Sequence, residues 1–177
     1  MRVIAGRLGG RLFDSPRTHR THPMSDKARG ALFGILGDIN GMQVLDPFAG
    51  TGALSFEAVS RGAAGALAIE SDKQAQKIIA ANIESLDLSE QVKLIGGTAN
   101  SWFNKNRQKT FDIVICDPPY EDLQYDLVEK LEYAVKPGGI FVVSWPKGGD
   151  LPRFRNLQLI EQRHYGDMQL VFYRRMQ

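Results

Sequence analysis

The feature that most constrains the fold is a regular alternation of short apolar runs with segments of helical periodicity, which starts at Met42 and continues almost to the end of the chain. The runs expected to form strands are 42–48, 65–70, 91–97, 111–117, 139–145, 157–164 and 168–175. The segments expected to form helices are 53–62, 72–88, 99–105 and 123–135. Strands that alternate with helices form a parallel sheet covered on both faces. The sequence therefore predicts an α/β fold with a doubly wound, mostly parallel sheet of seven strands.

The two ends of the chain depart from this alternation. The last two strands have no helix between them, so we expect an antiparallel hairpin at one edge of the sheet. Near the N-terminus, "RVIAG" and "RLFDS" flank "RLGG", a pattern that predicts a small β-hairpin. A helix should follow from its N-cap Ser25 to Gly37. With 177 residues, of which 43% are hydrophobic, the chain can form one well-buried domain, at 25–177, with an appendage at 1–24.

Charge is distributed unevenly along the chain. Residues 1–30 hold seven basic side chains against two acidic ones, a net +5, whereas the whole chain carries only +2, which leaves −3 for the remainder. Clustered arginines commonly neutralise phosphates, so the basic end suggests a polyanionic partner, although a solvated tail would look the same. The candidate RNA-binding residues in and beside this segment are Arg2, Arg7, Arg11, Arg17, Arg20, His22 and Arg29.

Other classes of protein are disfavoured by composition. The single cysteine, Cys116, cannot form an internal disulfide and fits a reducing compartment. The N-terminus has no apolar stretch of the signal-peptide type, and no run approaches the length of a membrane span, so we expect a cytoplasmic protein. His, Cys, Asp and Glu nowhere cluster at metal-ligand spacing, and we therefore predict no metal site.

A glycine loop after the first predicted strand indicates a cofactor site. In "VLDPFAGTGALSFEA", Gly50 and Gly52 allow the backbone to approach a ligand closely, and Glu70 ends the next strand where a carboxylate can accept both hydroxyls of a ribose. A dinucleotide fingerprint would need glycine or alanine at Ser55. The acidic Asp46 before the loop suits a cofactor with an amine better than a pyrophosphate, which binds bare amides. S-adenosylmethionine carries both an amine and a sulfonium.

The stretch "FDIVICDPPYEDL" indicates a second functional element. Two consecutive prolines fix φ and cannot donate backbone hydrogen bonds, so Pro118 and Pro119 should end the strand and stiffen the turn. The turn would hold Asp117 and Tyr120 still. An exocyclic aromatic amine is a poor nucleophile, and Asp117 with the Pro118 carbonyl could stabilise the charge that develops on it, while Tyr120 stacks on the base. A carboxylate accepts the adjacent N1–H and N2 donors of guanine together, which modestly favours guanine over adenine.

These motifs, in the order "LDPFAGTGALSFEAVSRGA", Glu70 and "DPPY", resemble the class I S-adenosylmethionine-dependent methyltransferases, in the branch that methylates amino groups. Three flanking stretches make the resemblance closer: "RVIAGRLGGRLFDSP", "HPMSDKARGALFGIL" and "YGDMQLVFYRR" are similar to the bacterial 16S ribosomal RNA guanine-N2 methyltransferases of the RsmD type. The resemblance implies a Rossmann-like fold, S-adenosylmethionine as cofactor, 16S rRNA in the small ribosomal subunit or its assembly intermediate as partner, and an N-terminal hairpin that helps grip the RNA. We expect a monomer.

The resemblance also implies roles for individual residues. The positions that surround the cofactor would be Asp46, Phe48, Gly50, Gly52, Glu70, Ser71, Thr98 and Ala99, and the catalytic positions would be Asp117, Pro118, Pro119 and Tyr120. The chain departs from the family pattern in two places. His22, Pro23 and Met24 stand where the family often has Arg-Pro-Thr, and Thr98 and Ala99 stand where a side-chain acceptor often receives the adenine amine. Backbone groups would then hold the adenine.

Three other functions remain open from the residues alone. An adenine-N6 methyltransferase acting on RNA or DNA would use the same turn. A catalytically idle RNA-binding assembly factor would keep the cofactor fold but would have no use for intact Asp117 and Tyr120. A nicotinamide-dependent oxidoreductase is disfavoured by the loop sequence and gives no role to "DPPY".

Overall fold

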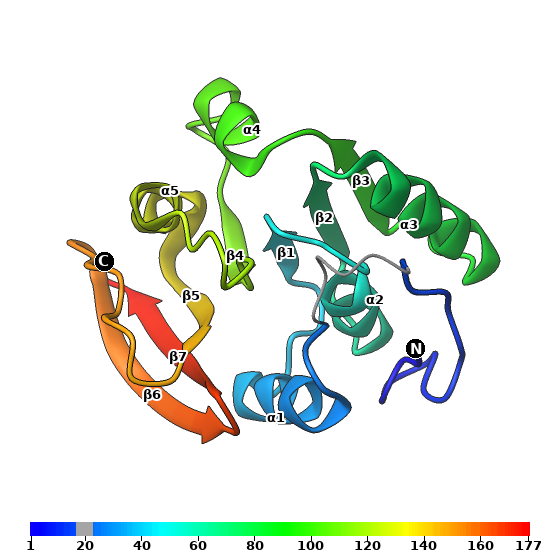
Figure 1. Cartoon of the computed structure of the whole chain (residues 1–177), viewed down its shortest axis with the longest axis horizontal. Helices are drawn as coiled ribbons and strands as arrows, with labels where there is room; N and C mark the ends of the chain where they lie inside the picture. Colours follow the sequence, from blue (N-terminus) through cyan, green and yellow to red (C-terminus); the bar gives the residue numbers. More distant parts are fainter. Residues whose placement is uncertain (17–22) are drawn as a thin grey trace.

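The computed structural model describes residues 1–16 and 23–177 and contains the predicted seven-stranded sheet (Figure 1). The strands lie in the order β3-β2-β1-β4-β5-β7-β6. Their bounds are β1 Gln43–Asp46, β2 Gly65–Glu70, β3 Val92–Gly96, β4 Phe111–Cys116, β5 Val135–Pro146, β6 Leu157–Tyr165 and β7 Met168–Arg175. Strands β1 to β5 pair in parallel, while β7 pairs antiparallel with both β5 and β6, which confirms the predicted hairpin edge.

The order of the strands reverses between β1 and β4. From β1 the chain first builds outward through β2 to β3 and then returns to place β4 on the other side of β1. In doubly wound sheets the crevice above the carboxyl ends of the strands at such a reversal is where ligands bind. Both predicted motifs, the glycine loop after β1 and the "DPPY" turn after β4, start at this position.

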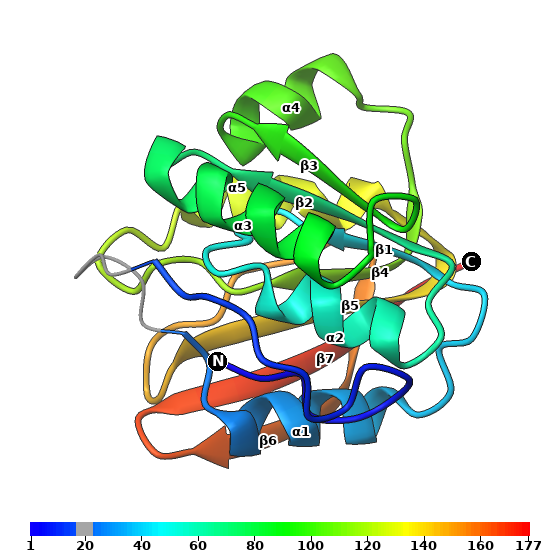
Figure 2. The same ribbon diagram turned by 90° about the vertical axis from the view of Figure 1, so that its right-hand side faces the viewer.

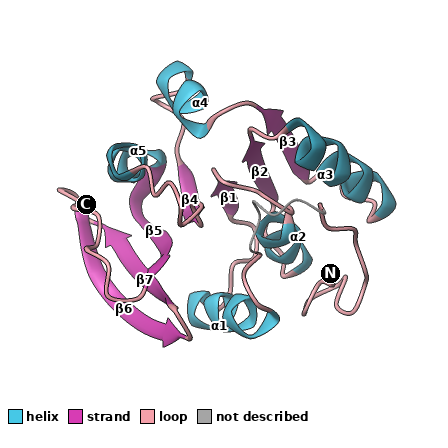
Figure 3. Ribbon diagram, viewed as in Figure 1, coloured by secondary structure: helices cyan, strands magenta, loops and turns pink. Residues whose placement is uncertain are grey.

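Helices cover both faces of the sheet, as Figure 3 shows most clearly. Their bounds are α1 Asp26–Leu36, α2 Ala53–Ser60, α3 Lys73–Ser85, α4 Ala99–Lys105 and α5 Tyr125–Lys130, with a 3-10 turn at Leu131–Ala134. The α1 helix is capped as predicted, because the Ser25 hydroxyl accepts from the Ala28 amide at 3.2 Å and Gly37 ends the helix at φ 73°. Among the described residues, no helix is both long and apolar enough to cross a membrane.

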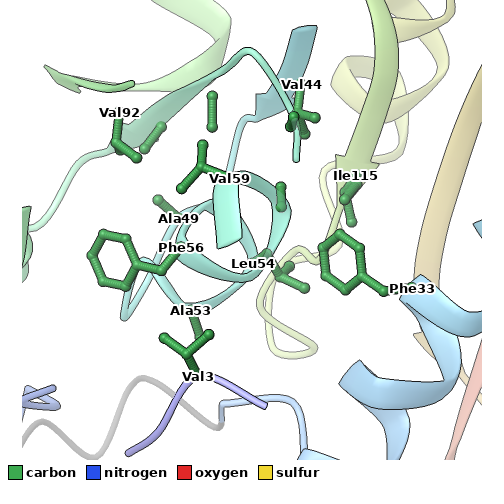
Figure 4. Packing of buried hydrophobic residues seen from close by; sticks show 14 of the residues in the cluster. Val3, Phe33, Val44, Ala49, Ala53, Leu54, Phe56, Val59, Val92 and Ile115 are labelled. Carbon is green, nitrogen blue, oxygen red and sulfur yellow. The ribbon is translucent and has the colours of Figure 1, made fainter. Parts of the chain in front are cut away.

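Two hydrophobic layers hold the helices against the sheet. Helices α1, α2 and α3 pack on one face, where Phe33, Phe56 and Val59 meet strand residues such as Val44 and Ile115 (Figure 4). The α4 and α5 helices pack on the opposite face around a second buried cluster. Alternate residues of the central strands enter opposite layers, so the strands are apolar on both sides, as the sequence pattern required.

The described part of the N-terminal segment forms an irregular turn that is tied to α2. The expected hairpin is present in a short form, with an antiparallel bridge between Arg2 and Leu12 and backbone hydrogen bonds that join Met1 to Phe13 and Val3 to Arg11, although neither arm is long enough to be a strand. Gly6 explains the close docking: its φ is 80°, and a Cβ there would lie 1.9 Å from the Ser60 carbonyl oxygen at the end of α2. Val3 lies in the same core as α2 (Figures 2 and 4). The described part of residues 1–24 therefore shares its core with the main domain.

A buried ionic network completes this docking and corrects one sequence-based expectation. Glu57 of α2 is fully buried and accepts hydrogen bonds from the amides of Ile4 and Ala5 at 2.7 and 3.1 Å. Arg29 lies within 3.8 Å of the same carboxylate and donates to the Arg2 carbonyl at 2.7 Å. The side chain of Arg29 is only 1% exposed. Arg29 therefore stabilises the docking of the N-terminal segment on α2. Its guanidinium is buried and not accessible to an RNA phosphate, contrary to the role suggested for it above.

Candidate active site at the carboxyl ends of the strands

The loop between β1 and α2 has the geometry expected of a cofactor loop. Both predicted glycines have positive φ, 54° at Gly50 and 80° at Gly52. A Cβ on Gly52 would lie 2.7 Å from the ring of Phe56, so no larger side chain fits between the loop and the helix. The half-buried Phe48 packs against the cluster that also contains α4 and α5. Glycine is thus required for the conformation of the turn. Because glycine has no side chain, a ligand can also approach the backbone of the loop closely.

Glu70 stands beside this loop, at the end of β2. One of its carboxylate oxygens accepts from the Gly50 amide at 2.7 Å, and the other accepts from the Asp72 amide at 2.7 Å. The two bonds fix the carboxylate above the carboxyl end of the sheet and link the first two strand-to-helix connections. Ser71 follows on the surface. The sequence separation between Gly50 and Glu70 predicted this proximity, and the structure brings the two residues into direct contact.

Asp46, the last residue of β1, is the most unusual ionisable group in the site. It is completely buried, and one oxygen accepts from the Ser55 hydroxyl at 2.9 Å, whereas its Oδ1 has no hydrogen-bond partner among the described residues. Burial raises the pKa of Asp46 to about 7, and the nearby carboxylates of Asp117 and Glu70 raise it further, against the lowering effect of Ser55. A buried acceptor without a donor is costly, so this oxygen is best satisfied by a bound group that brings a donor or a positive charge.

The "DPPY" turn leaves β4 beside Asp46 and is rigid, as its sequence predicted. Pro118 is buried and Pro119 is exposed, and the turn closes through a hydrogen bond from the Asp122 amide to the Pro119 carbonyl at 2.9 Å. Gln124 has a left-handed φ of 49°, which is uncommon for a residue with a side chain and reverses the chain direction just before α5. The turn thus holds the Asp117 carboxylate at the strand end and projects Tyr120 outward.

Ser144 of β5 links these two side chains. Its hydroxyl lies 2.9 Å from the Tyr120 hydroxyl, and it is itself buried. Burial raises the pKa of Asp117 to about 6, and hydrogen bonding to Ser144 partly opposes that shift. Tyr120 keeps 43% of its surface exposed, so its ring remains available to a ligand while its hydroxyl is anchored. Burial also raises the pKa of the Tyr120 phenol to about 12, which keeps it protonated.

Ser55 and Ser144 belong to this arrangement but were not predicted as site residues from the sequence. Ser55 appeared only as a departure from a dinucleotide fingerprint, yet its hydroxyl donates a hydrogen bond to Asp46. Ser144 interrupts the apolar run of β5, and a polar residue inside a strand that is buried on both faces is the signal that could have identified it.

The side chains after β3 do not replace the missing adenine acceptor. The Thr98 hydroxyl caps α4 by accepting from the Ser101 amide at 3.1 Å, and Ala99 is buried. The neighbouring Asn100 instead lines a hollow of about 400 Å³, together with Gln124, Tyr125, Asp126, Leu127 and Lys130. A second hollow of about 410 Å³ lies around Asp112 and Lys136, at the amino-terminal ends of β4 and β5, and is therefore separate from this site.

Of the basic candidates that are described, Arg7 and Arg11 lie away from the "DPPY" turn. Arg2 is exposed and pairs with Asp26 at 2.9 Å. Arg7 bonds the side chain of Gln91 just before β3, and Arg11 donates to the Ser85 carbonyl at the end of α3 at 3.1 Å. These contacts place Arg7 and Arg11 near the amino-terminal edge of the sheet, opposite the "DPPY" turn. Arg17, Arg20 and His22 lie outside the described residues. Over the ranges 1–16 and 23–177, no cluster of three His, Cys, Asp or Glu residues could hold a metal ion.

Comparison with known proteins agrees with this geometry. The chain is 34% identical over 119 residues to the ribosomal RNA small subunit methyltransferase D of Buchnera aphidicola, in an alignment that spans 67% of this chain and 62% of that protein. The protein of the same name from Haemophilus influenzae is 29% identical over 98% of this chain and 92% of its own length. The solved structure of yhhF from Escherichia coli, described as a candidate methyltransferase, superposes with a TM-score of 0.88 at 29% identity and covers 99% of this chain and 98% of its own.

A family model described as conserved hypothetical protein 95 matches residues 1–174, which is nearly the whole chain and includes the N-terminal segment, the glycine loop and the "DPPY" turn. The chain therefore belongs to that family, the RsmD-type methyltransferases.

Proposed function

We propose that this protein transfers a methyl group from S-adenosylmethionine to the exocyclic N2 amine of a guanine in 16S rRNA of the small ribosomal subunit. The observation that carries the proposal is the pairing of two elements at the point where the strand order reverses. One is the buried Asp46 with an unpartnered oxygen beside the glycine loop, and the other is the rigid turn that presents Asp117 and Tyr120. The relatives named for rRNA methylation make RNA the substrate class.

The residues of the first element fit the methyl donor. A cationic amine near Asp46 would satisfy its free oxygen and favour its ionised form, which the pKa of about 7 leaves only partly populated at neutral pH. Glu70 would exchange its bonds with loop amides for bonds with ribose hydroxyls. Phe48, Gly50, Gly52, Ser71, Thr98 and Ala99 complete the proposed cofactor positions. When bound, the sulfonium supplies a methyl group that is already activated for transfer.

The second element would act on the guanine. Asp117 and the Pro118 carbonyl can accept hydrogen bonds from the N2 amine and so stabilise the positive charge that grows on nitrogen as it attacks. As the N2–methyl bond forms, the bond between the methyl carbon and the sulfonium sulfur would break and leave a neutral thioether, while the nitrogen loses one proton that the Asp117 carboxylate would receive. Its pKa of about 6 keeps it mostly ionised at neutral pH while leaving it basic enough to serve. The exposed ring of Tyr120 provides a face on which a splayed-out base can stack.

RNA binding would extend beyond the target base. Arg7 and Arg11 lie near the opposite edge of the sheet, so we propose that they contact phosphates of a region of the RNA away from the methylated guanine. Arg2, Arg17, Arg20 and His22 are proposed to contribute to RNA binding as well. The protein would act as a monomer in the cytoplasm, on 16S rRNA within the small subunit or its assembly intermediate.

The test is transfer of labelled methyl groups to small ribosomal subunits that lack native methylation, with naked 16S RNA, large subunits and duplex DNA in parallel. Recovery of the label as N2-methylguanosine in small-subunit RNA would support the cofactor, reaction and substrate class together. Label in adenine would instead indicate an adenine-N6 enzyme. The absence of label in every substrate, although S-adenosylmethionine binds, would favour the assembly-factor alternative.

A variant separates the enzyme from an idle binding protein. Asp117→Ala should lose turnover by a factor of 100 or more, estimated as roughly the contribution of one electrostatic contact in a transition state, and should retain RNA binding. Asp38→Ala is the matched control, because Asp38 is exposed beyond the end of α1. Equal activity of the two variants would remove Asp117 from the mechanism.

A further inference from the structure

Ser144 occupies a position in β5 where an apolar residue would be expected. It is only 1% exposed and lies in the run Phe141–Trp145, whose other members are all fully buried apolar residues. The pairing of β4 with β5 places Cys116 opposite Val143, so the next residues along the two strands, Asp117 and Ser144, come level with each other. The strand register therefore brings a buried hydroxyl to the place where the catalytic turn begins.

The hydroxyl of Ser144 can serve both side chains of the turn at once. A serine hydroxyl has one hydrogen to donate and two lone pairs with which to accept. The Ser144 hydroxyl lies 2.9 Å from the Tyr120 hydroxyl, and either oxygen can be the donor in that contact. An ionised carboxylate only accepts, so in a bond to Asp117 the donor is Ser144, and its lone pairs then remain to accept from the Tyr120 phenol. In this arrangement the donors run from Tyr120 through Ser144 to Asp117. Both partners are fixed by one buried atom on a rigid strand.

We propose that Ser144 is a positioning residue for methyl transfer. Its hydroxyl fixes the Tyr120 ring relative to the Asp117 carboxylate, so that a base stacked on Tyr120 lies in a fixed position relative to its hydrogen-bond acceptor. This inference rests on the proposed function. It also explains why a tyrosine, with an anchoring hydroxyl, stands at the end of the turn. A phenylalanine could stack equally well but could not be held by Ser144.

The competing explanation is that Ser144 only satisfies packing inside the sheet. A purely structural serine would, when replaced, lower stability and cofactor binding together, and its effect would not depend on Tyr120. A positioning serine acts by linking its two partners, so most of its effect on kcat should be lost once the Tyr120 hydroxyl is gone. Because the two explanations differ in this coupling, a double-mutant cycle can separate them.

The experiment compares Ser144→Ala, Tyr120→Phe and the double variant in the methyl-transfer assay. Each single change should lower kcat about tenfold, the effect of one lost positioning hydrogen bond, and the double variant should be nearly as active as the singles. Affinities for RNA and S-adenosylmethionine should stay within about twofold of the parent, a change too small to count as a lost contact.

Ser144→Thr keeps the hydroxyl and should recover much of the rate, and Ser85→Ala, on the exposed end of α3, is the matched control. Additive losses, or no loss in either single variant, would overturn the proposal.

The pH dependence of the reaction rate provides a second, independent test of the bond between Ser144 and Asp117. Donation from Ser144 lowers the pKa of Asp117, so its removal should move the acid limb of the rate profile to higher pH. The charged or titratable groups that interact with Asp117 are Asp46 on β1, the buried thiol of Cys116 and the phenol of Tyr120. Ser144→Ala leaves Asp46 and Cys116 unchanged and removes a hydrogen bond from the phenol, whose pKa of about 12 keeps it neutral over the acid limb. An unmoved acid limb in Ser144→Ala would contradict a bond between Ser144 and Asp117.

A measurement without substrate keeps this inference separate from the proposed function. Hydrogen exchange of the backbone amides at 120–124 should be faster in Ser144→Ala and in Tyr120→Phe than in the parent, because the turn loses its anchor to β5. Faster exchange with an inactive parent protein would mean that the anchor exists and that the proposed reaction is wrong. Unchanged exchange in both variants would overturn the anchoring role whatever the activity of the parent.

Discussion

Replacement of Asp46 by asparagine should stabilise the protein without cofactor at alkaline pH, although it removes a residue of the proposed cofactor site. The raised pKa of about 7, against an ordinary value of 3.8, means that ionised Asp46 is unfavourable in the folded state. A difference of about 3 units corresponds to about 4 kcal/mol of folding free energy that is lost as the pH rises from below 4 to above 7. The stability of the parent should therefore fall over this range.

Asparagine removes that cost but introduces a smaller one. Its carbonyl oxygen can keep the bond from Ser55, while its amide nitrogen takes the place of the unpartnered Oδ1 and has no acceptor there. An unsatisfied buried donor costs about 1–3 kcal/mol. At pH 8 the variant should thus be more stable than the parent by about 1–3 kcal/mol, the difference between the two terms. At pH 4, where Asp46 is protonated in the folded parent, the advantage should disappear or reverse.

The assay is urea denaturation of parent and variant at pH 4, 6 and 8 without cofactor, with Asp38→Asn as the exposed control. The same samples with saturating S-adenosylmethionine should show the opposite order at pH 8, because only the parent gains stability from the ligand. A variant that is less stable than the parent by the same amount at all three pH values would refute the reasoning, since it would show that the ionisation of Asp46 carries no cost.

Three further predictions concern the turn, the basic segment and the buried network. The value of kcat/KM should rise with pH through about 6 as Asp117 ionises, and a flat profile from pH 5 to 7 would exclude it as the acceptor. Arg7→Ala with Arg11→Ala should weaken RNA binding and reduce the salt slope by about 1.5, as for two lost phosphate contacts, while calorimetry shows unchanged cofactor affinity. Glu57→Gln leaves the buried Arg29 without its anionic partner in α2, so urea denaturation should show a loss of about 3–5 kcal/mol, whereas the exposed Glu84→Gln should lose under about 1 kcal/mol.

The sequence predicted the sheet well because its signals are local. Runs of apolar residues separated by helical periodicity determine a doubly wound sheet almost without regard to long-range detail, and the missing helix before residue 168 identified the antiparallel edge. The contact between Gly50 and Glu70 could also be predicted, since it follows from two adjacent parallel strands that end at the same edge.

The remaining features depend on contacts between residues far apart in the chain. Arg29 has the sequence context of a basic surface segment, and only the docking of residues 2–5 on α2 buries it beside Glu57. Likewise, the short N-terminal hairpin also bonds to the end of α2, through the Arg7 amide and the Ser60 carbonyl, because Gly6 allows the close approach. Ser144 needs the register of β4 and β5 to reach Tyr120, and no local pattern contains that register.

The two raised pKa values also suggest how donor binding prepares the site for the substrate. Burial raises the pKa of both groups, and the negative charge of Asp117 raises the pKa of Asp46 further. With values of about 6 and about 7, Asp117 ionises first as the pH rises and Asp46 follows. A cation bound beside Asp46 would favour its ionised form, so Asp46 would then ionise at a lower pH than in the free protein, and both carboxylates would be formed at neutral pH when the methyl donor is in place. The pH at which Asp46 titrates, followed by NMR of its carboxyl carbon, should accordingly fall when S-adenosylmethionine is added, and an unchanged value would show that no cation binds beside Asp46.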